Sequence, residues 1–244
     1  MSLFRRSSKV LKDFSALEVD LHNHVLPGID DGSPTLDESR KMLELWQELG
    51  IRKVITTPHV INALYPNTKE QILGQTYALQ DHIKEWGLDL ILEATAEYQI
   101  DFEFRHLLEN DEVIPFGPQN YLLLEFPFQK PSYSVEEVIY EVQLKGYEPV
   151  IAHPERYYYY HQDFGKYEAF RDKGILLQLN LNSLTGLYGG APKKIAEKLV
   201  DAGLIDFAGS DAHFAEHLQD LKKLLHNRRY IKLLESGNLR NATL

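Results

Sequence analysis

The hydrophobic and polar positions along this chain alternate between two periodicities. Short, nearly continuous apolar runs are typical of strands buried in a parallel sheet, and the segments between them carry apolar residues every three or four positions, as amphipathic helices do. The predicted strands cover residues 19–22, 53–57, 90–97, 121–125, 149–152, 176–180 and 205–209. The predicted helices cover residues 35–50, 67–86, 102–108, 134–146, a segment that ends at Gly174, 192–203 and 218–235.

Capping residues mark several of the predicted helix ends. Thr35 with Glu38, and Ser134 with Glu137, have the Ser/Thr-x-x-Glu spacing of a capping box. Gly50 follows the last apolar position of the first helix, which is a common place for a C-terminal glycine. These signals support an α/β chain in which strands and helices alternate.

The alternation comprises seven strand–helix units with no linker between them. Seven parallel strands covered by helices favour a closed sheet, so we expect a distorted TIM-like (β/α)7 barrel in a single domain. A doubly wound open sheet is the alternative. We expect this domain to cover residues 17–244 and residues 1–16 to form a mobile basic arm, with an anchor on a membrane surface as the alternative role.

Composition narrows the classes of function. The 244 residues carry a formal net charge of −10 and include no cysteine. The negative charge argues against nucleic acid as a partner, and the lack of cysteine excludes disulfides, thiolate zinc sites and cysteine nucleophiles. No apolar run has the roughly 18 residues that a membrane span needs, and no apolar signal-peptide core follows Met1. We therefore expect a cytoplasmic protein without a transmembrane segment.

Histidines and carboxylates follow the ends of most predicted strands. Because all strand ends of a parallel barrel open on one face, these side chains are expected to meet there as one metal site. The turn after the first strand can add Asp30 or Asp31 as an oxygen ligand. Each residue alone also has a simpler interpretation, as a helix cap or a hydrogen-bonded core histidine. The residues at strand ends are His22, His24, His59, Glu97, Glu125, His153, Asp211 and His213.

The same residues resemble the motifs of the polymerase and histidinol phosphatase (PHP) family. The motifs are Asp20-x-His22-x-His24, Thr57-Pro58-His59, the separate Glu97 and Glu125, Ala152-His153-Pro154-Glu155-Arg156 and Ser210-Asp211-Ala212-His213. The loop of residues 26–32 and the His-Pro-Glu-Arg motif are similar to one branch of that family, the bacterial metal-dependent protein tyrosine phosphatases of capsule and exopolysaccharide synthesis. The resemblance covers residues 18–213 and implies a PHP-type distorted barrel.

The resemblance also implies the cofactors and the ligand set. It places two or three divalent metal ions at the site, with manganese expected and iron or zinc as the alternatives. By similarity, one ion is surrounded by His22, His24, Asp211 and either Glu97 or Glu125. A second is held by Glu125 and His153, and a third by Asp31, His59 and His213. The implied partner is a phosphotyrosine protein, namely an autophosphorylating tyrosine kinase that controls polysaccharide export.

Further residues are candidates for catalysis and substrate binding. We expect Arg156, Asp31 and His59 to act in catalysis, with the Arg156 guanidinium holding phosphate oxygens; the alternative for Arg156 is an ion pair with Glu155 or a nearby acid. Tyr157 begins a run of four tyrosines that forms either an aromatic wall for substrate or a packing strip. Asn180 either contacts substrate or caps the next segment.

One departure from the branch concerns a second phosphate-binding arginine. Members often carry it shortly after the last Asp-x-His motif, but here no arginine occurs between His213 and Arg228. His217 and Lys222 are the candidate substitutes. The remaining histidines in predicted helices, His82, His106 and His226, are expected to be surface or packing residues.

Three functions follow from these observations. A metal-dependent phosphotyrosine phosphatase explains the whole motif set best. A small-molecule phosphatase, acting for example on histidinol phosphate, requires the same metal ligands. A non-catalytic metal-stabilised binding module needs fewer ligands than this sequence provides. The sequence leaves the physiological substrate, the native metal and the oligomeric state open.

Overall fold

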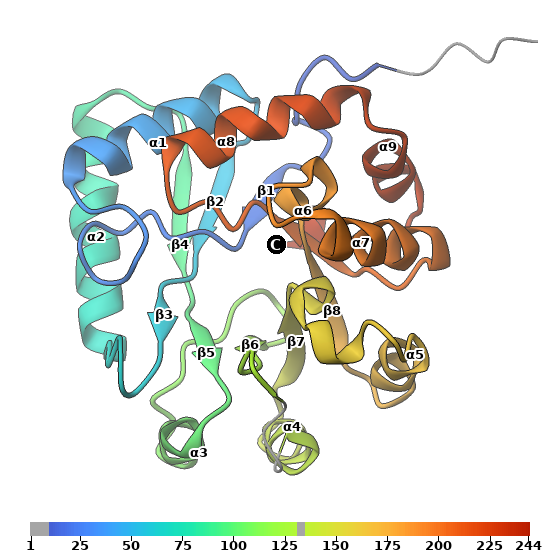
Figure 1. Cartoon of the computed structure of the whole chain (residues 1–244). Helices are drawn as coiled ribbons and strands as arrows, with labels where there is room; N and C mark the ends of the chain where they lie inside the picture. The colour runs from blue at the N-terminus through green and yellow to red at the C-terminus, as the bar shows by residue number, and fades with distance from the viewer. Residues whose placement is uncertain (1–9, 131–134) are drawn as a thin grey trace, which may run out of the picture.

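The computed structural model describes residues 10–130 and 135–244 and shows strands alternating with helices throughout. Figure 1 shows the helices lying outside a curled set of strands. The strands are β1 (Val19–Leu21), β2 (Lys53–Thr56), β3 (His59–Val60), β4 (Ile91–Ala94), β5 (Glu97–Gln99), β6 (Tyr121–Glu125), β7 (Glu148–Ala152), β8 (Leu176–Asn180) and β9 (Phe207–Gly209). The helices are α1 (Leu36–Glu48), α2 (Lys69–Glu85), α3 (Phe102–Glu109), α4 (Val135–Leu144), α5 (Gly165–Asp172), α6 (Leu181–Thr185), α7 (Gly190–Ala202), α8 (Ala215–Leu221) and α9 (Arg228–Glu235).

All paired strands are parallel, and they form two sheets that together make the predicted distorted barrel. One sheet has the order β1-β2-β4, and the other has the order β3-β5-β6-β7-β8-β9. The sheets meet where β9 approaches β1, through a parallel bridge between Asn23 and Ala212. There a Cβ on Gly209 would lie 1.6 Å from the Leu21 carbonyl oxygen, so this approach requires glycine.

One predicted strand is broken in the structure, and another is followed by a short strand that was not predicted. Residues 53–57 were expected to form one strand and form β2, after which the unpredicted β3 begins in the second sheet; residues 90–97 were expected to form one strand but contain β4 and the start of β5, which belong to different sheets. Pro58 lies between β2 and β3, where its lack of an N–H group ends the ladder. As a result Glu97 begins β5 instead of ending a strand.

The C-terminal part of the chain also differs from the expectation. The predicted helix 218–235 is divided into α8, a 3₁₀ turn at Lys222–His226 and α9. Asn227 starts α9, because its side chain accepts hydrogen bonds from the amides of Arg229 and Tyr230. The short helix α6 was not predicted. The Ser134 cap lies outside the described residues.

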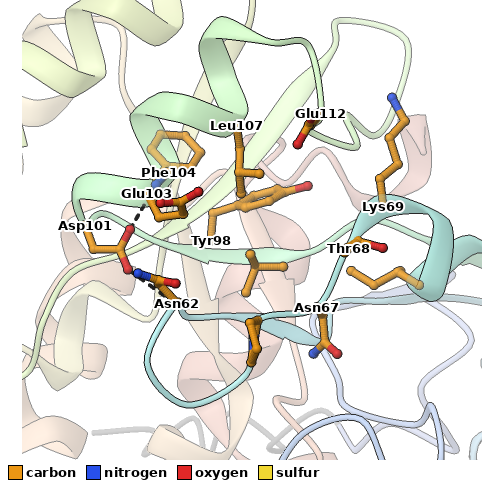
Figure 2. Close-up of a pocket in the computed structure, with 13 residues that line it drawn as sticks. Asn62, Asn67, Thr68, Lys69, Tyr98, Asp101, Glu103, Phe104, Leu107 and Glu112 are labelled. Atoms are coloured by element: carbon orange, nitrogen blue, oxygen red, sulfur yellow. Dashed lines mark hydrogen bonds between the residues drawn. The ribbon is translucent and has the colours of Figure 1, made fainter.

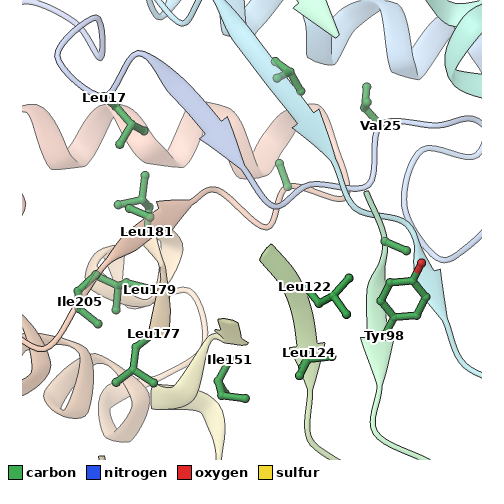
Figure 3. Packing of buried hydrophobic residues seen from close by; sticks show 14 of the residues in the cluster. Leu17, Val25, Tyr98, Leu122, Leu124, Ile151, Leu177, Leu179, Leu181 and Ile205 are labelled. Carbon is green, nitrogen blue, oxygen red and sulfur yellow. The ribbon is translucent and has the colours of Figure 1, made fainter. Parts of the chain in front are cut away.

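Successive side chains along a strand point to opposite faces of the sheet, so they belong to two different hydrophobic clusters. Leu122 and Leu124 of β6 pack outward into the larger cluster, which includes helix residues, and Leu177 and Leu179 of β8 do the same (Figure 3). The opposite side chains, such as Leu123, belong to a smaller cluster inside the barrel. Because this apolar filling occupies the interior below the strand ends, the polar residues gather at the carboxyl ends.

The start of the described chain packs on the barrel. The Leu11 amide donates a hydrogen bond to the Leu225 carbonyl, and the Phe14 amide donates one to the Leu49 carbonyl. The Phe14 side chain is buried. Of the predicted basic arm, residues 1–9 lie outside the described part of the structure. Within the described ranges, no helix is both long enough and apolar enough to cross a membrane.

Asn241 connects the two strands that close the barrel, and we expect its replacement to destabilise the fold. Its buried side chain donates to the carbonyls of Val19 in β1 and Ala208 in β9 and accepts from the Ala208 amide. Asn241→Ala leaves buried backbone groups without partners, which should cost about 2–3 kcal/mol. Thermal unfolding of this variant checks the loss, with Asn238→Ala as the control, since Asn238 is exposed and its side chain makes one hydrogen bond. Equal stability of both variants would contradict this role.

Candidate metal centre

The nine predicted ligands come together at one mouth of the barrel, where His59 and Glu97 begin β3 and β5 and most of the others end or follow a strand. They form four groups whose potential ligand atoms lie within 4.8 Å of one another. The groups are His24, Asp31, His59 and His213; His22, His24 and Asp211; His22, Glu97 and His153; and His59, Glu97 and Glu125. Since the groups share members, they form one continuous centre inside the mouth of the barrel.

Unusual backbone conformations turn several of these side chains inward. His22, His153 and Asp211 have positive φ angles of 100°, 33° and 49°. Such angles are uncommon for residues other than glycine and persist only where surrounding structure enforces them. The three residues stand where β1, β7 and β9 end, so the strain lies at the points where the chain leaves the barrel wall and enters the site.

Glu97 occupies the middle of the centre. Its side chain is fully buried, with Oε2 3.2 Å from His22 Nε2 and 3.0 Å from His59 Nδ1. Its Oε1 lies 2.8 Å from His153 Nε2, and Glu125 Oε1 lies 3.4 Å from the same nitrogen. Glu97 therefore faces three imidazoles and can bridge two metal ions.

Asp211 presents one carboxylate oxygen to the site and has the other fixed by hydrogen bonds. Oδ1 lies 3.4 Å from His22 Nε2 and 3.3 Å from His24 Nε2. Oδ2 accepts hydrogen bonds from Arg156 Nη1, from the Asn180 side-chain amide, both at 2.7 Å, and from the Tyr188 hydroxyl at 3.3 Å. This division leaves Oδ1 available as a ligand.

Asp31 lies at the opening of the site. Its side chain is 52% exposed, with Oδ1 3.4 Å from His59 Nε2 and 3.5 Å from His213 Nε2. The neighbouring Asp30 does not point a free oxygen into the site, because its Oδ2 accepts hydrogen bonds from His24 Nδ1 at 2.7 Å and from the His59 amide at 3.0 Å. Of the two aspartates in this turn, Asp31 is therefore the ligand candidate and Asp30 orients His24.

Unpaired buried atoms show that these residues suit divalent cations. Within the described residues, His22 Nε2, His24 Nε2, His59 Nδ1 and Glu97 Oε2 are buried without a hydrogen-bond partner. The other ring nitrogens of His22 and His24 are held by Gln178 Oε1 and Asp30 Oδ2. A second partner that fixes one imidazole nitrogen while the other points into a site is the usual arrangement of metal-bound histidine. Imidazole and carboxylate ligands favour manganese, iron or zinc.

The buried carboxylates of the centre raise the pKa values of its histidines. Burial alone lowers the pKa of His22, but Glu97 and Asp211 outweigh it and raise that pKa to about 9. For His59 burial acts in the same way, and Glu97 is the main group that raises its pKa to about 10. Burial opposes ionisation of Glu97, yet His22 and His59 hold the Glu97 pKa well below its ordinary value. Without metal, protons on the histidines thus balance the buried carboxylates.

Metal loading should therefore depend on pH, because a metal ion must displace protons from His22 and His59. Histidine pKa values raised in the metal-free protein mean that their contribution to its stability is complete below about pH 6.5 and is lost as pH rises through about 9 to 10. Apparent metal affinity should rise over the same interval. Calorimetric titration with manganese in buffers of different ionisation enthalpy checks the proton release. Binding without proton release would contradict the expectation.

Arg156 lies between two aromatic side chains at the edge of the centre. Its guanidinium carbon is 4.8 Å from the Phe128 ring centroid and 4.4 Å from that of Tyr188. Its acidic partner is Asp211, whereas Glu155 is buried and accepts hydrogen bonds from the Asn180 amide and the Ser183 hydroxyl. The guanidinium thus borders the metal ligands, where it can also meet a phosphate.

The two other predicted substrate-binding residues have clear structural contacts. Tyr157 is fully buried, and its hydroxyl donates to the Ala152 carbonyl and accepts from the Phe126 amide. Tyr157 therefore packs behind the site, and Tyr158 is the exposed member of this run. Asn180 caps α6 through the Asn182 amide in addition to holding Asp211. We assign both residues supporting roles, and substrate contact by Asn180 stays a prediction.

His217 and Lys222, the candidate substitutes for a second phosphate-binding arginine, differ in their burial. His217 is half-buried beside His213, whose amide donates to His217 Nδ1 at 3.3 Å. Burial and then the charge of His213 lower the pKa of His217, which makes it a poor cationic clamp at neutral pH. Lys222 is exposed. His82 and His106 lie on α2 and α3, and His226 ends a 3₁₀ turn, all outside the four ligand groups.

Sequence reasoning missed several residues that support the centre. Gln178 accepts from His22 Nδ1 at 2.8 Å and from the His153 amide at 3.2 Å. Its signal in the sequence was a single polar residue inside the apolar run 176–179. Phe128 and Tyr188 carried no such signal, because aromatic residues in loops occur in many roles.

Replacing Gln178 should weaken metal binding without removing a ligand. Gln178→Leu leaves His22 Nδ1 without its acceptor, and loss of such an orienting partner typically costs about 10- to 100-fold in metal affinity. Competition of the variant with a metal-binding dye measures the loss. Gln143→Leu, which removes a hydrogen bond to the Lys173 carbonyl far from the centre, is the control. Equal metal affinity in the two variants would refute the role of Gln178.

A separate cavity of about 220 Å³ lies behind β3 and β5. Figure 2 shows Tyr98, Phe104 and Leu107 in its wall, with Asp101, Glu103 and Lys69 among its polar residues. The described residues that line it include none of the nine ligands. Strand alternation explains this separation, because His59 and Glu97 face the metal centre while the next residues, Val60 and Tyr98, face the cavity.

Comparisons with known proteins agree with this geometry. The model of a family described as capsular polysaccharide synthesis, CpsB/CapC, matches residues 18–233. The chain is 32% identical over 216 residues to the putative tyrosine-protein phosphatase CapC of Staphylococcus aureus, covering 88% of this chain and 84% of that protein. It is 33% identical over 195 residues to the tyrosine-protein phosphatase YwqE of Bacillus subtilis, covering 80% and 77% of the two chains.

Solved structures show the same relationship. A structure from the work on Bacillus subtilis YwqE and Streptococcus pneumoniae CpsB, described as unique metal-dependent tyrosine phosphatases, superposes with a TM-score of 0.78 at 32% identity. That comparison covers 91% of this chain and 94% of the other. A putative histidinol phosphatase of Listeria monocytogenes, at 14% identity and a TM-score of 0.51 over 82% and 96% of the chains, shares the fold.

Proposed function

Because the chain belongs to the CpsB/CapC family of capsular polysaccharide synthesis proteins, we propose that it is a metal-dependent protein tyrosine phosphatase. The observation that carries this proposal is the convergence of unpaired, buried imidazole nitrogens and a carboxylate oxygen on one centre beside Arg156. Relatives named tyrosine-protein phosphatases, at 32–33% identity over most of both chains, support the same reaction.

The nine ligand residues would hold two or three divalent ions. One ion fits the group of His22, His24 and Asp211, and another fits the outer group that contains Asp31 and His213. Glu97 belongs both to the group with His22 and His153 and to the group with His59 and Glu125, so it would be shared between ions held there. Bound divalent ions supply Lewis acidity that polarises a phosphoryl oxygen and lowers the pKa of water from about 15.7 towards about 7. Manganese is our choice among the metals that this ligand set suits.

The residues of this chain then position the phosphate. Glu97 and Asp211 fix where cations bind, because each faces two or more imidazoles across the centre. Arg156 is held by Asp211 at 2.7 Å and offers further N–H groups to phosphate oxygens. A tyrosine leaving group, with a pKa of about 10, departs more readily than the alkoxide of serine. This difference favours phosphotyrosine as the substrate.

We infer a protein partner from the family description. The proposed substrate is a tyrosine-phosphorylated protein of capsule or exopolysaccharide synthesis, and the candidate is an autophosphorylating tyrosine kinase. We propose that the two proteins interact in the cytoplasm. Phosphate release from such a kinase, purified in its phosphorylated form, tests this part separately. Release from a phosphotyrosine peptide without release from the kinase would reject the partner and retain the reaction.

The reaction itself is tested with manganese-reconstituted protein on three substrates. These are a phosphotyrosine peptide, the matched phosphoserine peptide and histidinol phosphate. We expect preference for phosphotyrosine, loss of turnover with chelator, and loss in His59→Ala but not in His82→Ala, which changes a histidine of α2 outside the ligand groups. Preference for histidinol phosphate would reject the tyrosine assignment. No turnover at full metal occupancy would indicate a non-catalytic module.

A further inference from the structure

Aromatic side chains from several loops border the metal ligands. Tyr65 lies beside His59, with ring centroids 5.8 Å apart, and Phe214 lies 6.4 Å from His213. Phe128, in the loop after β6, is parallel to the His153 ring within 19° at 5.6 Å. These rings give the mouth of the site an aromatic lining that the metal ligands themselves do not require.

Phe128 is distinguished because it contacts both parts of the centre that would hold phosphate. One neighbour is His153, a member of a ligand group, and the other is the Arg156 guanidinium at 4.8 Å. Tyr188 lies beside Arg156 at 4.4 Å and hydrogen-bonds Asp211. His153, Phe128, Arg156 and Tyr188 thus form a chain of neighbouring planar groups along one side of the site.

A large part of the Phe128 surface is also accessible to solvent. Its side chain keeps 41% of its surface accessible, whereas the nearby Phe126 is fully buried. An aromatic ring next to an arginine and a ligand histidine, with this much free surface, can receive a second ring in an offset or edge-to-face arrangement. The accessible part of Phe128 is therefore available to a bound molecule.

We propose that Phe128 determines specificity by contacting the aromatic ring of the substrate. The proposal rests on the function proposed above and names the residue that favours an aryl over an alkyl phosphate. In phosphotyrosine a single oxygen joins the ring to phosphorus, so the ring lies close to the groups that border the phosphate and can contact one of them. Phe128 borders the phosphate between His153 and Arg156.

The experiment measures binding of two phosphonates that are not hydrolysed. Phenylphosphonate and methylphosphonate are titrated calorimetrically into the manganese-loaded protein, with metal content checked for each variant. The parent should bind the phenyl compound about 3- to 10-fold more tightly, the range expected for one aromatic pair. Phe128→Ala should remove this preference while leaving methylphosphonate affinity unchanged, and Phe128→Tyr should restore it. Phe102→Ala, an 87% exposed phenylalanine at the start of α3, is the control.

The outcomes separate this inference from the proposed reaction. Equal weakening of both phosphonates in Phe128→Ala would mean that Phe128 acts only by holding Arg156, and would overturn the inference. Equal affinity of the parent for both compounds would also overturn it, even if phosphotyrosine is hydrolysed. A phenyl preference that depends on Phe128 in a protein without phosphotyrosine turnover would support the ring contact and reject the proposed reaction.

Discussion

Glu97→Gln should reduce phosphotyrosine hydrolysis by about 10³-fold or more, because it removes the charge on which the metal centre is built. Glu97 Oε2 lies within 3.2 Å of nitrogens of His22 and His59, and Oε1 lies 2.8 Å from His153. The amide keeps the shape of the side chain but cannot bridge cations. Loss of several kcal/mol of charge stabilisation at 1.36 kcal/mol per tenfold gives this magnitude.

The measurement combines kcat/KM with metal content for the same preparation. Glu97→Gln should bind fewer metal ions than the parent, and raising the manganese concentration should restore activity only in part. Glu93→Gln is the control, since Glu93 lies on β4, half-exposed, and pairs with Lys53 at 2.7 Å outside the ligand groups. Full activity of Glu97→Gln at normal metal content would show that Glu97 is only a hydrogen-bond partner of the histidines.

Strand periodicity predicted the fold because parallel barrel strands are buried on both sides. The runs 121–125 and 176–180 became β6 and β8 with the same bounds. The short strand β3 and the break between β4 and β5 were missed, since β3 has only two residues and no glycine or proline marks the change of sheet at Thr95-Ala96. The apolar pattern of one sequence indicates which residues are buried, but it does not indicate which strands pair with each other.

The site was more predictable than the fold details. Ligand types recur at the carboxyl ends of strands, so His22 and His153, which are far apart in sequence, could be assigned to one centre before their 5.4 Å ring separation was known. The residues around the ligands were less predictable. Gln178, Phe128 and Tyr188 act through specific contacts that arise only when loops from different strands meet.

Arg156→Ala should lower kcat/KM for phosphotyrosine by about 10²- to 10³-fold, the usual effect of removing one preorganised donor to a reacting oxyanion. Arg156→Lys should recover only part of this loss, because an ammonium keeps the charge but not the paired N–H groups of guanidinium. Arg171→Ala is the control, since Arg171 forms its ion pair with Asp206 away from the metal ligands.

Metal content decides between the two roles open to Arg156. If the guanidinium serves only to fix Asp211, Arg156→Ala should lose metal, and excess manganese should restore kcat/KM, because Asn180 and Tyr188 still donate to Asp211 Oδ2. If it holds phosphate, metal content should stay near that of the parent while inhibition by inorganic phosphate weakens. We expect the second result, since two other donors already fix Asp211 and the guanidinium has only one of its five N–H groups engaged there.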